Sequence, residues 1–227
     1  MKRSLTYSIV FLFAFGPLAG LQAANYTIPA VSAGDGFFHN EAGSSWDYFD
    51  STGSTVKAHY EFWGTSDTLL YDTGYLQFSM DAIPDGSPIS AATLHVNITE
   101  IYYSSDSPSG GYLKFVRADT ANGQASQRLN GSVTLVELKD QAPGWLAVDI
   151  TEHMQTAVDD AYGHIAFSAN PNTSGYFRNA GFTFTSADNG SDGPYLSVTT
   201  VPEPAAFALA GGLVALGLAY WRRRARS

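Results

Sequence analysis

The sequence predicts an all-β fold, an antiparallel β-sandwich or jelly roll with one short helix, followed by a C-terminal hydrophobic helix. Segments rich in Val, Ile, Thr, Tyr and Phe alternate with clusters of Gly, Asn, Asp, Ser and Pro, as expected for strands joined by turns. Residues 92–98 alternate between a polar face and the apolar Leu94, Val96 and Ile98, which is the period of a half-buried strand. The uncharged run at 205–221 predicts the terminal helix.

The same pattern places the other strands. They are expected at residues 56–62, 75–80, 112–117, 133–138, 145–150, 164–169, 181–185 and 195–199. A turn is expected at 83–88, where Pro and Gly supply preset and permissive φ angles. Residues 151–158 carry apolar side chains at helical spacing and follow Thr151 as the predicted N-cap, so a short helix is expected there.

The two ends of the chain carry sorting features. Lys2 and Arg3 precede an apolar stretch at 9–21 and small residues at Ala23 and Ala24, which predicts a signal peptide over residues 1–24 that signal peptidase removes. A single domain is then expected over 25–200, and a separate segment over 201–227.

The C-terminal segment resembles the PEP-CTERM sorting signal of Gram-negative bacteria. The motif Pro202, Glu203 and Pro204 is followed by a 17-residue apolar run, against about 20 residues for a full bilayer span. Four arginines close it and are expected to form a cytoplasmic stop: Arg222, Arg223, Arg224 and Arg226. The resemblance implies an exosortase partner, retention at the inner membrane before processing, and a cell-surface or extracellular-matrix location afterwards. The alternative is a short membrane anchor.

Charge and cysteine content narrow the function. Between residues 25 and 200 there are six Lys and Arg against 20 Asp and Glu, so a basic face for nucleic acid is not available. The chain has no cysteine, which excludes disulfides, thiol nucleophiles and thiolate metal sites. An acidic domain of this kind suits solubility and the binding of divalent cations, and the alternative is that its acidity serves solubility alone.

A second resemblance covers about residues 35–200. The order of Leu76-Gln77-Phe78, a Pro-Asp-Gly turn at 84–86 and the strand at 89–96 resembles the DNRLRE family of bacterial surface domains. Segments 144–151, 163–167 and 193–198 continue the likeness in the same order. The resemblance implies a jelly-roll module of secreted, often carbohydrate-active proteins.

Aromatic residues beside polar ones are the candidates for a sugar site, because sugars present apolar C–H faces and hydroxyl edges. The candidate ligand-binding residues are Trp46, Tyr48, Trp63, Tyr176 and Arg178. The alternative for the first three is burial under a sheet edge. Trp145, in an alternating strand, is expected to be buried.

Loop oxygens provide a candidate calcium site. Asp188, Asn189 and Asp192 lie in a Gly-rich segment whose carboxylate and amide oxygens suit Ca²⁺, although the segment does not fit an EF-hand loop. The alternative is a solvated turn. No other cofactor is indicated, the five histidines lack zinc-site spacing, and no catalytic residue is assigned.

We therefore expect a non-catalytic exported surface or matrix protein, associated with exopolysaccharide and able to bind carbohydrate. Two alternatives stay open at this point. One is a secreted polysaccharide-degrading lyase or hydrolase, which needs an organised cluster of carboxylates, or of Tyr and His, in a cleft. The other is a protein-adhesion module, which needs a flat exposed apolar patch.

Overall fold

The computed structural model describes residues 23–41, 48–50, 53–63, 68–102, 109–118, 133–173, 179–201 and 204–224. The chain divides into two compact units. One is Ala23–Val201, and the other combines Met1–Gln22 with Pro202–Ser227. The described part of the second unit is the helix α2 (Pro204–Arg224).

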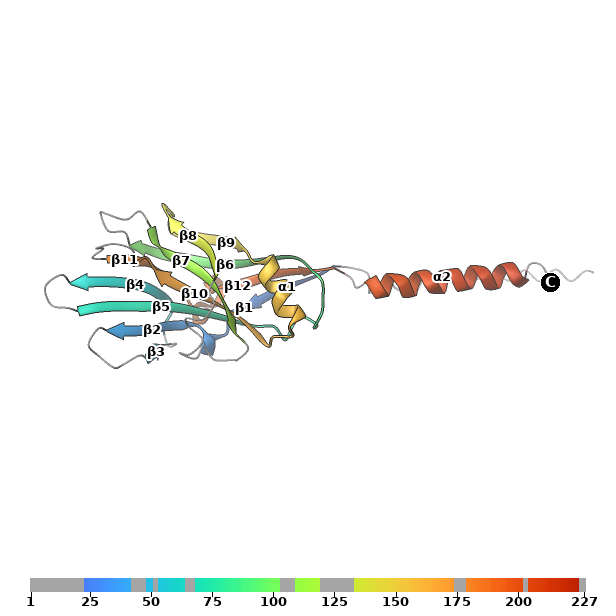
Figure 1. The fold of residues 1–227 in the computed structure, drawn as a ribbon, viewed down its shortest axis with the longest axis horizontal. Coiled ribbons are helices and arrows are strands. Elements are labelled where there is room, and N and C mark those ends of the chain that lie inside the picture. The colour runs from blue at the N-terminus through green and yellow to red at the C-terminus, as the bar shows by residue number, and fades with distance from the viewer. Residues whose placement is uncertain are drawn as a thin grey trace, which may run out of the picture. The chain divides into compact units, whose positions relative to one another are not determined.

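The first unit is built from antiparallel strands with a few short helices (Figure 1). In chain order its elements are β1 (Ala24–Pro29), η2 (Ser32–Gly34), β2 (Gly36–Glu41), β3 (Tyr48–Asp50), β4 (Thr55–Trp63), β5 (Thr68–Ser79), β6 (Ile89–Tyr102), β7 (Ser109–Ala118), β8 (Val133–Lys139), β9 (Gly144–Asp149), α1 (Thr151–Asp159), β10 (His164–Pro171), β11 (Asn179–Thr185), η4 (Ala187–Asp192) and β12 (Tyr195–Thr200). Every predicted strand is present. β1, β2 and β3 were not predicted.

Strand order joins distant parts of the chain. Neighbouring strands follow the path β1-β12-β6-β11-β4-β5-β10-β7-β8, with β2 beside β5, β3 beside β2 and β9 beside β6. The long strand β6 pairs with β12 through its first half and with β11 through its second half, while β9 lies along its other edge. Because all these pairs are antiparallel, the predicted antiparallel class is confirmed, and the arrangement supports a β-sandwich.

The core fills the space between the strands. Leu94, Val96 and Ile98 are 0–1% exposed, as the alternation in β6 predicts. Phe78 and Phe167 meet edge to face with ring centroids 5.8 Å apart, an arrangement that aromatic pairs prefer. The apolar positions of the strands therefore supply a large core cluster and a smaller second one around Phe38 and Tyr75, without any disulfide.

The short helix α1 lies across one end of the strands (Figure 1) and buries Met154, Ala157 and Val158. Its N-cap is Ile150, so the prediction of Thr151 is wrong by one residue. Thr151 is the first helical residue, and its hydroxyl oxygen accepts the N–H of Ala92 at 3.0 Å, which anchors the helix to β6. The predicted turn is present, with Gly86 at φ 72°.

The predicted C-terminal helix forms as α2, with Arg222, Arg223 and Arg224 exposed in its last turn. Within the described residues, however, no helix is both long enough and apolar enough to cross a membrane. The apolar run is 17 residues long and includes Gly211, Gly212 and Gly217, which contribute little hydrophobicity. The prediction of a long hydrophobic helix is corrected accordingly.

Candidate functional site

Three ring side chains meet on the outer side of the first unit. Trp145 of β9 is 48% exposed and contacts Tyr195 of β12 edge to face, with ring centroids 5.7 Å apart. Tyr195 in turn stacks on His95 of β6, with centroids 4.4 Å apart and planes 9° apart. We call Trp145, Tyr195 and His95 the aromatic face.

Strand register explains why these rings gather. Tyr195 lies directly opposite His95 in the β12–β6 pair, and Trp145 lies opposite Asn97 in the β9–β6 pair. His95 and Asn97 occupy the polar positions of β6, whose intervening apolar residues are in the core. Because paired residues share a side of the sheet, all four side chains point away from the core.

Polar groups surround the aromatic face. The Nε2 atom of His95 lies 3.0 Å from the hydroxyl of Ser197, which fixes the imidazole ring beneath Tyr195. On the β1 side, Tyr195 borders a hollow of about 300 Å³ that is also lined by Thr27, Pro29 and residues of η4. This volume is at the lower end of the range for small-molecule sites.

A hollow of about 340 Å³ lies elsewhere on this unit, beside the turn that follows β5, and Tyr162 is the aromatic residue in its lining. It lacks the paired rings of the aromatic face. The aromatic face is therefore the better candidate for a ligand with apolar faces.

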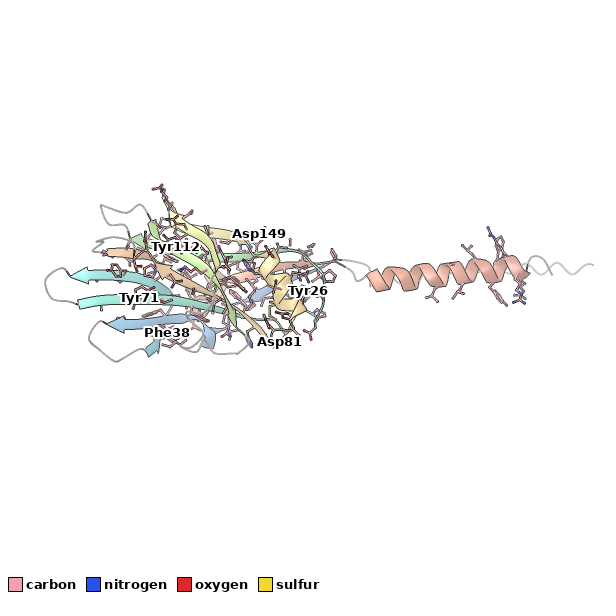
Figure 2. All side chains as sticks on the ribbon, viewed as in Figure 1. Tyr26, Phe38, Tyr71, Asp81, Tyr112 and Asp149 are labelled. Carbon is pink, nitrogen blue, oxygen red and sulfur yellow. The ribbon has the colours of Figure 1, made fainter. Side chains whose placement is uncertain are left out.

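Two titratable groups on this side of the sheet are His95 and, at the other end of β9 from Trp145, Asp149. Burial lowers the pKa of His95, so the imidazole is neutral at pH 7 and stacks as an uncharged ring. Asp149, labelled in Figure 2 at the end of β9, accepts hydrogen bonds from the hydroxyl and N–H of Thr151, and these lower its pKa. The rings of the aromatic face are thus neutral, and the negative charge of Asp149 lies farther along β9.

Trp145 corrects a sequence prediction. Its strand alternates as expected, and Val148 is buried, but the tryptophan falls on the outward side of β9. β9 pairs only with β6 among the described strands, so no neighbouring strand covers Trp145 from its free edge. The alternation in β9 separated its residues into two faces, but it did not show which face packs on the core and which carries Trp145 into solvent.

The candidate ligand-binding residues from the sequence are largely outside the described part of the chain. Trp46, Tyr176 and Arg178 lie outside the described residues. Tyr48 begins β3 and Trp63 ends β4, but their side chains are not among those described. Their roles stay predictions.

Backbone register does bring the flanks of these segments to one region of the sheet. Tyr48 lies opposite His39, His39 opposite Asp72, and Asp72 opposite His59. Within this row, Nδ1 of His39 lies 2.5 Å from Asp72 Oδ1, and Nε2 of His59 lies 2.9 Å from Asn179 Oδ1. The row spans four strands, β3, β2, β5 and β4. Among its described side chains, those of His39, Asp72 and His59, no two rings stack as Tyr195 and His95 do.

The predicted calcium ligands lie together on η4. Asp188, Asn189 and Asp192 are exposed, and the backbone oxygen of Asp192 accepts a hydrogen bond from the Thr185 hydroxyl. In the described part of the chain, no three His, Cys, Asp or Glu side chains gather as a metal-binding group. Calcium binding by these three residues stays a prediction.

The sorting residues are only partly described. Pro202, Glu203 and Arg226 lie outside the described residues, whereas Pro204 is the first residue of α2. Proline favours that position, because its missing N–H has no partner in the first turn of a helix.

An antiparallel β-sandwich with exposed, paired rings on one side has the features of a ligand-binding module. Residues 55–200 match carbohydrate-binding module family 96, and the chain belongs to this family. The match starts with β4 and ends with β12, so it includes all three residues of the aromatic face. No curated protein matches the chain. The DNRLRE and PEP-CTERM likenesses stay resemblances.

Proposed function

We propose that this protein is a non-catalytic carbohydrate-binding protein that holds polysaccharide on the aromatic face. The observation that carries the proposal is the exposed indole of Trp145 packed against Tyr195, within a chain of a carbohydrate-binding family. Large exposed rings with fixed orientation are the groups on which the C–H faces of a sugar pack.

The geometry gives the two rings different roles. Trp145 presents nearly half of its surface to solvent, so it offers the larger apolar platform. Tyr195 is half-buried and held by His95, so its ring costs little conformational entropy on binding. Asn97, opposite Trp145, and Ser197 supply hydrogen-bonding groups for sugar hydroxyls on the same side of the sheet.

Charge favours an uncharged polysaccharide. Residues 25–200 carry six basic against 20 acidic side chains, and Asp149 adds a negative charge on the same strand as Trp145. A uronate or sulfate polymer is repelled by this field unless cations screen it. We therefore expect neutral glycans to bind more tightly than anionic ones at low salt.

The test is a binding measurement with the full-length protein and a panel of neutral and anionic polysaccharides. Trp145→Ala is expected to weaken binding at least tenfold, because it removes the platform. Trp221→Ala is the matched control, since Trp221 is 59% exposed but lies on α2, and it should bind like the wild type. If Trp145→Ala binds polysaccharide as tightly as the wild type, the binding site is not on the aromatic face.

Release of shortened chains from a bound polysaccharide would support the enzymatic alternative instead. Binding to proteins but to no glycan would support the adhesion alternative. Both readouts come from the same panel, by sizing the polysaccharide after incubation and by including protein ligands.

We also propose that the protein is exported and sorted by its ends, as a signal peptide over 1–24 and an exosortase signal over 201–227 imply. Support comes from the start of β1 at Ala24, next to the expected cleavage point, and from the three arginines that end α2. Mass spectrometry of protein recovered from cells should then find an N-terminus near residue 25 and loss of the C-terminal segment. An intact C-terminus in exported protein would overturn the sorting proposal.

A further inference from the structure

One buried carboxylate in the β unit is incompletely bonded. Asp35, between η2 and β2, is 0% exposed. Its Oδ2 atom accepts the backbone N–H of Ala187, the first residue of η4. Its Oδ1 atom is also buried and has no hydrogen-bond partner. Buried carboxylate oxygens rarely stay unbonded, because burying a charge without a partner is costly.

The groups around Asp35 do not compensate its charge. Burial raises the pKa of Asp35 to about 6, the Ala187 N–H lowers it, and the negative charge of Asp188 raises it again. Asp188 directly follows Ala187, the residue whose N–H Asp35 accepts, so a second carboxylate belongs to the segment that Asp35 contacts. Among the described residues, no Lys, Arg or His forms an ion pair with Asp35.

We propose that Asp35 and Asp188 bind a calcium ion between the start of β2 and η4. Ca²⁺ takes six to eight oxygen ligands and accepts carboxylates, backbone carbonyls and water. Two carboxylates are compatible with the lack of any three-residue acidic or histidine group in the described chain, because carbonyls and water complete the shell. The ion would neutralise the buried charge and supply the missing partner of Oδ1.

This site differs from the one that the sequence alone indicates. Asp188 is common to both sites, but the second carboxylate here is Asp35, which is buried and carries an unbonded oxygen, in place of the exposed Asn189 and Asp192. In the sequence, Asp35 lies 152 residues before Ala187, the residue to which it is hydrogen-bonded. A calcium ion here would bridge the residue that precedes β2 and the helix η4, which precedes β12.

The proposal is independent of glycan binding, because no residue of the aromatic face takes part. Its consequence is stability, since a ligand that binds only the folded state raises the melting temperature as its concentration passes the dissociation constant. The test is thermal unfolding and titration calorimetry of the chelator-treated full-length protein with CaCl2, with MgCl2 in parallel.

The wild type should show a saturable rise in melting temperature with CaCl2 that excess chelator reverses. Asp35→Asn, which keeps the side-chain volume, should abolish both the rise and the calorimetric heat. Asp188→Asn should weaken calcium binding at least tenfold. Asp85→Asn, an exposed aspartate in the turn before β6, is the matched control and should behave like the wild type.

Two results would overturn the proposal. One is a wild-type protein with neither heat nor thermal shift on adding calcium. The other is an Asp35→Asn protein that keeps the full shift. If Asp35→Asn does not fold, the exposed Asp188→Asn variant decides, because an unchanged calcium affinity in it also removes the proposed site.

Discussion

Tyr195 and His95 face each other across the β12–β6 pair, with ring centroids 4.4 Å apart and planes within 9° of parallel. The imidazole is itself fixed by its contact with Ser197 at 3.0 Å. Tyr195 is therefore held in place before any ligand arrives, and Trp145 packs against its edge. A preformed pair of rings loses little freedom on binding, which favours affinity.

The Tyr195 ring, rather than its hydroxyl, is expected to provide the contact with sugar. Tyr195→Phe keeps the ring and should bind glycan within about threefold of the wild type. Tyr195→Ala removes both the ring and the support for Trp145, so a loss of about tenfold or more is expected, the equivalent of roughly 1.4 kcal/mol. Titration calorimetry with a polysaccharide that the wild type binds measures the affinity of each variant. Equal losses in both variants would assign the contact to the hydroxyl.

His95 should make stability depend on pH. Its pKa is lowered in the folded protein by burial, so between that pKa and 6.5 the unfolded chain binds more protons than the folded one. This contribution is complete above pH 6.5 and is lost as the pH falls through the folded pKa. Melting temperatures at pH 5 and 7.5 should differ less in His95→Gln than in the wild type. An identical pH dependence in both proteins would exclude His95 as a source.

Phe182 of β11 tests the central part of the core. The ring is 0% exposed and lies on the strand that joins β6 to β4. Phe182→Ala should cost about 3–5 kcal/mol, because it removes buried surface and leaves a cavity, whereas Phe182→Leu should cost clearly less. Chemical denaturation measures the loss of unfolding free energy in each variant, provided that the dependence of this free energy on denaturant concentration is the same as in the wild type. A loss below about 1 kcal/mol in the alanine variant would show that the ring is not in the core.

The sequence predicted the regular part of this fold well. The alternation at residues 92–98 matches the burial of that part of β6 residue by residue, and the helical spacing of Met154, Ala157 and Val158 matches the buried side of α1. β2 was missed because its polar residues, such as His39, interrupt the alternation, and its partner in the sheet is a distant segment, β5. Tertiary pairing, rather than local preference, makes that segment a strand.

The candidate site was predictable only in part. The positions of His95 in a strand and of Trp145 in an alternating segment were both expected, yet their meeting with Tyr195 depends on the β9–β6–β12 order. Strand order is set by long-range contacts that one sequence does not display. The partnership of Asp35 with η4 was invisible for the same reason.

Gly111 and Gly86 provide a last test, because both have positive φ but only one is crowded. At Gly111, φ is 153° and a Cβ atom would lie 2.3 Å from the backbone oxygen of Asn170. At Gly86, φ is 72° and nothing lies within 4 Å of the added atom. Gly86→Ala should therefore cost only about 1–2 kcal/mol of backbone strain.

Gly111→Ala should cost more than about 3 kcal/mol, since either β7 or its partner β10 has to move. For a domain of this size each kcal/mol lowers the melting temperature by about 2–4 °C, so the two variants should separate clearly in one thermal scan. Equal melting temperatures would mean that the close approach of β7 and β10 at Gly111 is absent in solution. A larger fall for Gly111→Ala with normal glycan binding at low temperature would show that this contact supports the sheet without shaping the aromatic face.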